Sequence, residues 1–191
     1  MQPTSGQRIP IKKGEDPNTY RYMMPRVSIR HSGNITTITN ISEIAKEIGR
    51  SASCLRQWLM ALLGLTTRID PKNANDLQIK GHHEASSIQD SIYEFINVFV
   101  ICPCCGNPET TMFVQNSELN LQCRACGRSS PAGGPSGGAR GKSKQAQKAV
   151  QKETTWILKH IHSENLQSHS LQSDAAVENL DDFEVPGPDM F

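Results

Sequence analysis

The chain has 191 residues, of which 36% are hydrophobic and 5% aromatic, and its formal net charge is +1. This low apolar content predicts that part of the chain is disordered. There is neither an apolar run of about 20 residues nor a signal-peptide pattern, so we expect a cytoplasmic protein without a membrane span. The charge is segregated: residues 1–30 carry +4, residues 131–160 carry +5 and residues 161–191 carry −7. Such asymmetry favours nucleic acid as the partner of the basic ends and a basic protein surface as the partner of the acidic end.

The first elements predicted are an arm, a hairpin and a helix. Residues 1–19 are polar and predict a flexible N-terminal arm. Two β-branched runs, 27–30 and 35–39, flank the turn residues 32–34 and predict a β-hairpin. Asn40 and Glu43 have the spacing of a capping box at the start of a helix that ends at Gly49.

Two further helices and a strand complete the first domain. Apolar residues recur at helical spacing over 53–63 and again over 86–99, and 77–80 reads as a short strand. The helices that meet near Gly49 resemble a helix-turn-helix, but we favour the alternative in which both pack on a sheet. The prediction is an α+β protein with a small α/β domain over 20–100.

Six cysteines are present, and five of them fall within 25 residues. Cys102 and Cys105 form one C-x-x-C pair, and Cys123 and Cys126 form a second pair after 17 intervening residues. This spacing predicts a structural Zn²⁺ ion held by four thiolates in a zinc ribbon over 101–130. Cys104 offers a surplus thiol, and the x-x spacing favours its pointing away from the metal. A redox C-x-x-C is the alternative, but it leaves the second pair unexplained.

The composition changes after the ribbon, over residues 131–191. A Gly- and Pro-rich stretch is typical of a linker, and 142–165 has the composition of a helix. The final residues mix acids and aromatics without periodicity. We read this segment as a disordered or partly helical tail, which either docks on a partner or only adds solubility.

Several short motifs, in order, resemble the N-terminal domain of eukaryotic translation initiation factor five. They are Asp16-Pro17, Tyr20-Arg21-Tyr22-Met23-Met24-Pro25, Gly81-His82-His83-Glu84, Ile88-Gln89-Asp90, Phe99-Val100-Ile101-Cys102-Pro103, Asn107-Pro108-Glu109-Thr110 and Cys123-Arg124-Ala125-Cys126-Gly127. The resemblance covers roughly residues 10–130. The beta subunit of initiation factor two shares this architecture but lacks the Tyr-Arg-Tyr-x-Met-Pro stretch.

The resemblance implies a translation initiation factor in the preinitiation complex. Its partners would be GTP-bound initiation factor two (gamma and beta subunits), initiator tRNA, mRNA and small-subunit ribosomal RNA, and it would help to select the start codon. The activating arginine of the family falls on Arg21, which would act in trans as an arginine finger on the partner GTPase. The chain itself would not be an enzyme, because it lacks a phosphate-binding G-x-x-x-x-G-K-[ST] loop. Contacts with RNA or the partner are expected from Arg26, Arg30, His31, Arg50 and Arg56.

The loss of three lysines weakens the GTPase-activating interpretation more than the fold, and the short C-terminal part is a further departure from the family pattern. Met23, Ile35 and Gln57 stand where the family has lysines, and only about 60 residues follow the ribbon, too few for the family's helical-repeat domain. One alternative is a non-catalytic subunit like the beta subunit of factor two. Another is a general zinc-ribbon protein that binds nucleic acid.

Overall fold

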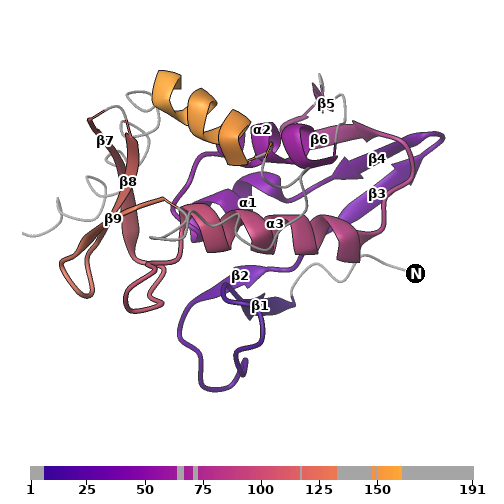
Figure 1. Cartoon of the computed structure of the whole chain (residues 1–191). Coiled ribbons are helices and arrows are strands. Elements are labelled where there is room, and N and C mark those ends of the chain that lie inside the picture. The colour runs from indigo at the N-terminus through magenta and orange to yellow at the C-terminus, as the bar shows by residue number, and fades with distance from the viewer. Residues whose placement is uncertain are drawn as a thin grey trace, which may run out of the picture.

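Two of the three antiparallel sheets lie at opposite ends of the molecule with helices between them, and the small two-stranded sheet lies below the helices in Figure 1. The structure is a computed structural model that describes residues 7–63, 67–70, 73–116, 118–132, 148 and 150–160. Its strands are β1 (Arg8–Pro10), β2 (Met23–Pro25), β3 (Ile29–Ser32), β4 (Ile35–Ile38), β5 (Thr67–Asp70), β6 (Asn73–Lys80), β7 (Thr110–Gln115), β8 (Glu118–Cys123) and β9 (Ser129–Pro131). The sheets have the orders β1-β2, β3-β4-β6-β5 and β7-β8-β9. The helices are α1 (Ile41–Glu47), α2 (Ala52–Leu63) and α3 (Ala85–Phe99). This is the α+β architecture that the sequence predicts.

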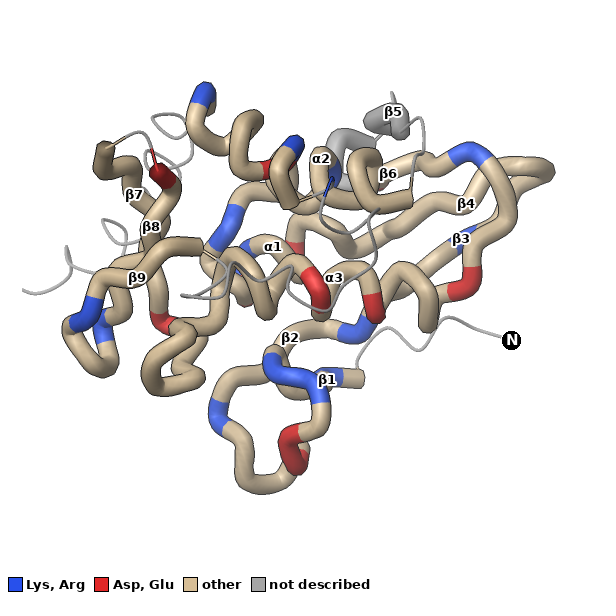
Figure 2. Tube along the Cα trace, in the orientation of Figure 1, with Lys and Arg blue, Asp and Glu red and all other residues tan. Residues whose placement is uncertain are grey.

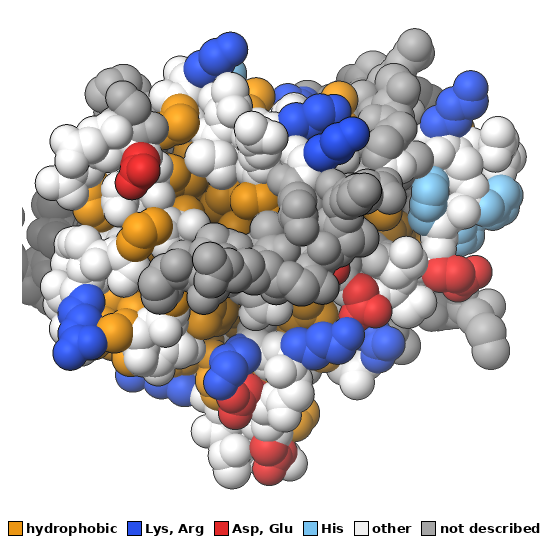
Figure 3. Space-filling model, viewed as in Figure 1, with side chains coloured by type: hydrophobic (Ala, Val, Ile, Leu, Met, Phe, Trp, Pro, Cys, Tyr) orange, Lys and Arg blue, Asp and Glu red, His pale blue; other side chains and the backbone are white. Residues whose placement is uncertain are grey.

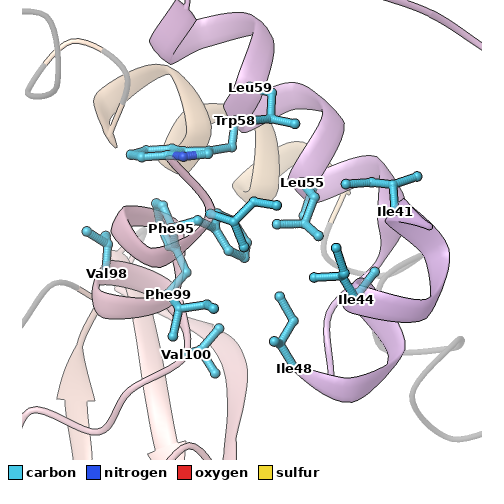
Figure 4. Close-up of a cluster of buried hydrophobic side chains, with 14 of the residues drawn as sticks. Ile41, Ile44, Ile48, Leu55, Trp58, Leu59, Phe95, Val98, Phe99 and Val100 are labelled. Carbon is cyan, nitrogen blue, oxygen red and sulfur yellow. The ribbon is translucent and has the colours of Figure 1, made fainter. Parts of the chain in front are cut away.

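One hydrophobic core joins the three helices (Figure 4). The apolar stripes predicted from the sequence are buried, and α1 packs on α2 and on the sheet strand β6, while α2 packs on α3. Trp58 lies at the centre, with its ring edge-on to the rings of Phe95 and Phe99 at centroid distances of 6.0 and 5.9 Å. The indole N–H of Trp58 donates to the carbonyl of Ser91 at 2.7 Å, so the polar atom of this buried ring is satisfied. Helix α1 therefore packs on the sheet as the favoured alternative predicts, whereas α2 packs mainly on the other two helices.

The capping box predicted at Asn40 is wrong. Asn40 is the residue before α1, but its side chain makes no capping hydrogen bond. Instead the Asn40 amide accepts from the Ser28 N–H at 3.0 Å and donates to the Arg26 carbonyl at 2.8 Å. The backbone entering β3 needs partners for these two groups, and the Asn40 amide satisfies both. Asn40 therefore fixes the connection from β2 to the hairpin.

The N-terminal region that the sequence predicts as a flexible arm is a closed loop where the structure describes it. β1 pairs antiparallel with β2, so residues 11–22 form a loop whose two ends are hydrogen-bonded together. The Ile11 N–H donates to the Tyr22 carbonyl at 3.0 Å. Two ion pairs add to this closure: Arg8 with Glu47 of α1 at 3.0 Å, and Lys13 with Asp90 of α3 at 2.6 Å. Residues 1–6 lie outside the described part.

A helical segment at 150–160 follows the ribbon and returns to the core, as the orange helix in Figure 1 shows. Ile157 is fully buried in the hydrophobic core, and Val150, Trp156 and Leu158 pack against it while half-buried. The helix predicted over 142–165 is thus described only in this part. The predicted acidic-aromatic tail beyond 160 lies outside the described residues. Among the helices of the described part, none combines the length and the apolar character that a membrane span requires.

Candidate functional site

Four cysteines gather at the end of the three-stranded sheet. They are Cys102, Cys105, Cys123 and Cys126, and their sulfur atoms all lie within 4.8 Å of one another. The Cys102 and Cys126 sulfurs are 3.8 Å apart, and those of Cys105 and Cys123 are 3.6 Å apart. A tetrahedral metal with metal–sulfur bonds of about 2.3 Å requires sulfurs about 3.8 Å apart. The geometry can therefore hold a metal ion, and these are the cysteines that the spacing predicts as ligands.

The two halves of the sulfur cluster are built by the same turn. In the first half Gly106 N–H donates to the Cys102 carbonyl at 2.9 Å, and in the second half Gly127 N–H donates to the Cys123 carbonyl at 3.0 Å. Gly106 and Gly127 have φ of +71° and +70°, which is left-handed backbone that glycine adopts without steric cost. Each turn thus directs two sulfurs to one side, and the antiparallel pair β7–β8 brings the two turns together.

Hydrogen bonds and crowding shift the cysteine pKa values in opposite directions. Burial alone would raise the pKa of Cys102, but the N–H groups of Cys105 and Cys104, with neighbouring thiols, lower it to about 7. The Asn107 N–H acts to lower the pKa of Cys105, but burial and the three adjacent thiols together raise it to about 12. Four sulfurs this close cannot all be thiolates without a cation between them. The donor set is therefore one that a divalent metal satisfies.

Cys104 lies outside the four-sulfur cluster. Its thiol is exposed, and its sulfur accepts a hydrogen bond from the Arg128 guanidinium at 2.8 Å. The same contact, together with the charge of Cys104, raises the pKa of Arg128. Cys104 therefore points away from the cluster, as the spacing predicts, and does not compete with the four predicted ligands for a metal ion.

Arg21 is exposed on the loop that joins β1 to β2. Its guanidinium lies 5.6 Å from the centroid of the Tyr22 ring. The Tyr20 ring packs edge-on to the Tyr22 ring at 5.9 Å, and burial is the main cause of the raised pKa of Tyr20. Arg21 is therefore carried between two partly buried tyrosines, and its own charged group faces outward.

Tyr22 also joins this loop to the four-cysteine unit, a contact that sequence reasoning did not predict. Its hydroxyl donates to the Glu109 carboxylate at 2.8 Å and accepts from the Asn107 amide at 3.2 Å. Tyr22 and Glu109 are 87 positions apart. The one hint in the sequence is that both residues belong to motifs of the same family pattern.

Arg50 contradicts the expectation that it contacts RNA. It is buried, and its guanidinium donates to the Phe99 carbonyl at 2.7 and 3.1 Å. It also donates to the Thr110 carbonyl and to the Thr110 hydroxyl, each at 2.8 Å. Phe99 ends α3 and Thr110 begins β7, so Arg50 joins the helical core to the ribbon. A guanidinium that donates to these buried acceptors cannot also reach a phosphate.

Arg30 and His31 lie exposed on β3, the first strand of the predicted hairpin. Arg30 pairs with Asp76 at 3.6 Å, and the His31 ring stacks on the His82 ring at 4.9 Å. The Thr36 hydroxyl donates its one proton to the Gly81 carbonyl at 2.7 Å, so Nδ1 of His31, 3.2 Å from that hydroxyl, must be the donor. Figure 3 shows histidines gathered at this end of the molecule.

The remaining predicted contact residues lie apart from one another. Arg26 is exposed after β2, where its guanidinium donates to the Gln7 side chain at 3.2 Å, and Arg56 is half-buried on α2. Figure 2 shows lysines and arginines distributed over the β1–β2 loop, the hairpin, the ribbon and the helices, without a single stripe. The structure thus brings the four cysteines together but leaves the predicted basic contacts as separate points.

Comparison with known proteins identifies the family. A model described as a domain found in initiation factors 2B and 5 matches residues 12–129, which includes the Arg21 loop, the helical core and the four cysteines. The chain belongs to this initiation-factor domain family. The match accords with the resemblance found in the sequence motifs.

Three relatives illustrate the range of this initiation-factor domain family. The chain is 39% identical over 114 residues to eukaryotic translation initiation factor 5 of Caenorhabditis elegans, covering 58% of this chain and 26% of that protein. It is 34% identical over 125 residues to the factor 5 of Mus musculus, covering 62% and 29%. It is 31% identical over 113 residues to translation initiation factor 2 subunit beta of Natronomonas pharaonis, covering 59% and 83%. The chain therefore spans about a quarter of the length of the factor 5 relatives.

Proposed function

We propose that this chain is a translation initiation factor that stimulates GTP hydrolysis by initiation factor two. The observation that carries the proposal is the exposed Arg21 guanidinium, presented on a closed loop between two anchored tyrosines. In phosphoryl transfer, negative charge spreads over the transferred phosphoryl group and the leaving oxygen, and a guanidinium supplied in trans stabilises that charge. Arginine suits this role because it stays ionised and offers a planar fork of donors.

The four cysteines hold a structural Zn²⁺ ion in this proposal. Four thiolates close the coordination sphere, so the ion has no open position for substrate and serves to fold the ribbon. The chain is an activator and not itself an enzyme, and it acts in the cytoplasm. GTP-bound factor two is the partner that the relatives named factor 5 and subunit beta support.

Initiator tRNA, mRNA and small-subunit ribosomal RNA are the proposed nucleic-acid partners. Arg30 and His31 are exposed at one end of the sheet, and Arg26 is exposed near the Arg21 loop. Exposed guanidinium groups can neutralise backbone phosphates, and an imidazole ring can stack on an unpaired base. Arg56, half-buried on α2, is a further candidate contact.

The test is single-turnover hydrolysis of labelled GTP by factor two, bound to initiator tRNA on small ribosomal subunits. The wild-type chain should accelerate phosphate release, and Arg21→Ala should reduce the acceleration by about 10³-fold or more, the range known for arginine fingers. Lys46→Ala is the matched control, because Lys46 is an exposed cation on α1 with no proposed contact. Equal acceleration by the wild type and Arg21→Ala would overturn the arginine-finger role.

A second function, as a non-catalytic subunit like the beta subunit of factor two, is favoured by two observations. The chain covers 83% of the Natronomonas pharaonis subunit beta, and Met23, Ile35 and Gln57 replace lysines of the factor five pattern. This function predicts tight binding to factor two with no acceleration by the wild type. Binding to bare RNA or DNA alone, with steep salt dependence, would indicate a general nucleic-acid-binding protein instead.

A further inference from the structure

The loop that carries Arg21 is attached to the turn that holds the first two cysteines. The Tyr22 hydroxyl sits between Asn107 and Glu109, at 3.2 Å from the Asn107 amide and 2.8 Å from the Glu109 carboxylate. The Asn107 amide oxygen in turn accepts from the Glu109 N–H at 2.8 Å. Tyr22, Asn107 and Glu109 thus form a small ring of hydrogen bonds, closed by the backbone N–H of Glu109, and we call these three residues the tyrosine junction.

The tyrosine junction is continuous with both cysteine turns. Cys102 N–H donates to the Asn107 carbonyl at 2.9 Å, and the Asn107 N–H bonds the Cys105 sulfur. Arg124, between the second pair of cysteines, donates its N–H to the Glu109 carbonyl at 2.9 Å. Residues 107–109 are therefore the place where both cysteine turns and the Arg21 loop meet.

A second residue of the Arg21 loop lies near the first cysteine turn. The Lys12 ammonium is held by Glu15 at 2.5 Å, and a Cβ added to Gly106 would lie 3.9 Å from it. Lys12 stands at the opposite end of the loop from Tyr22, directly after Ile11, whose N–H donates to the Tyr22 carbonyl. Both ends of the loop therefore face the first cysteine turn.

From this geometry we infer that metal binding by the four cysteines sets the position of Arg21, with Tyr22 as the positioning residue. Without a metal the two cysteine turns have no common ligand, so residues 107–109 lose the frame that orients their side chains. Tyr22 then loses both hydrogen-bond partners. Arg21 is the adjacent residue and lies 5.6 Å from the Tyr22 ring, so its placement follows that of the tyrosine.

Amide hydrogen exchange on the full chain, with Zn²⁺ bound or removed by a chelator, tests the structural part. The Ile11 N–H donates to the Tyr22 carbonyl, so its exchange reports how firmly Tyr22 is held. Chelation should speed this exchange about tenfold, because Tyr22 loses the hydrogen bond from its hydroxyl to the charged Glu109 carboxylate. Tyr22→Phe should give the same acceleration with Zn²⁺ bound and leave no further effect of chelation on this amide. Glu109→Gln keeps a carbonyl acceptor for the hydroxyl and should retain the zinc dependence.

Tyr93→Phe is the matched control for these exchange measurements. It also removes a tyrosine hydroxyl that contacts the loop region, since Tyr93 donates to the Pro10 carbonyl at 3.1 Å, and this hydroxyl is not part of the tyrosine junction. The effect of chelation on Ile11 should persist in Tyr93→Phe. An Ile11 amide that chelation does not change in the wild type, or that chelation still accelerates fully in Tyr22→Phe, would overturn the inference.

The functional part rests on the proposed role of Arg21 and is measured separately. Tyr22→Phe should lower the maximal stimulated rate of GTP hydrolysis about tenfold while the half-saturating concentration of the chain stays unchanged, since the variant misplaces Arg21 without losing a partner contact. A raised half-saturating concentration with an unchanged maximal rate would assign Tyr22 to partner binding and overturn its positioning role. If the wild type gives no stimulation, the proposed function fails, and the exchange measurements still decide the coupling.

Discussion

Arg50 shows how a single charged residue can be structural although its type suggests a phosphate contact. Its guanidinium reaches two chain segments at once, the end of α3 and the start of β7. The carbonyl at a helix C-terminus carries partial negative charge, so a cation there is favourable. The Thr110 hydroxyl also donates to the Val100 carbonyl at 2.6 Å, which extends the network across the joint.

We expect Arg50→Ala to lower the free energy of unfolding by about 3 kcal/mol, because it leaves the acceptors of Phe99 and Thr110 buried without a donor. Chemical denaturation followed by tryptophan fluorescence measures this, since Trp58 is buried in the same core. Lys46→Ala, which removes an exposed cation, should change stability by less than about 0.5 kcal/mol. A similar small change for Arg50→Ala would contradict the structural role.

Among the elements, the ribbon depends most on its ligand. Its two cysteine turns are largely exposed, and the four-cysteine unit is too small to fold on apolar burial alone. We expect the chain to bind one Zn²⁺ ion and the ribbon amides to lose their exchange protection when the ion is removed. Metal content by plasma emission and exchange of β7 and β8 amides check this.

Two cysteine variants sharpen the prediction about the metal. Cys105→Ala removes a member of the sulfur cluster and should lower the affinity for Zn²⁺ strongly. Cys104→Ala alters the adjacent residue, whose sulfur contacts Arg128 outside the cluster, and should retain one ion per chain. Equal loss of metal in the two variants would show that the ligand set is different.

The sequence predicted those elements whose evidence is local. The stripes of α1, α2 and α3 and the paired cysteine spacing recur within a few residues, and the structure buries or gathers them. β1, β2 and β9 were not predicted, because strands of three residues are too short to show an alternating pattern. Asn40 was assigned to the nearest helix end, although its partners lie in the segment before β3.

The site could be predicted in part for the same reason. The four cysteines can be recognised from their regular spacing within one stretch of sequence, whereas the tyrosine junction joins residues about 87 positions apart. The hydrogen bonds from Arg50 to the Phe99 and Thr110 carbonyls likewise join residues that are far apart in the sequence. A side chain that bonds to distant backbone carbonyls leaves no pattern in its own neighbourhood, so only the fold reveals its role.

At the scale of the whole molecule, the segment at 150–160 completes the core from outside the region matched by the family. Ile157 is fully buried, and the family match ends at residue 129. We expect Ile157→Ala to lower the free energy of unfolding by about 2 kcal/mol, the cost of removing buried methyl groups without refilling the space. Thermal unfolding measures it, with the exposed Lys159→Ala as control. An unchanged midpoint for Ile157→Ala would mean that this segment does not contribute to the core.

The Arg50 joint has a consequence for how the molecule assembles. The Arg50 guanidinium lies just after α1, but one of its acceptors, the Thr110 carbonyl, is 60 positions further along the chain. Until β7 arrives, the partly folded helices would enclose a charge with too few partners, which is unfavourable. A newly made chain should therefore keep the Arg50 end of its helical half open until the residues of β7 emerge.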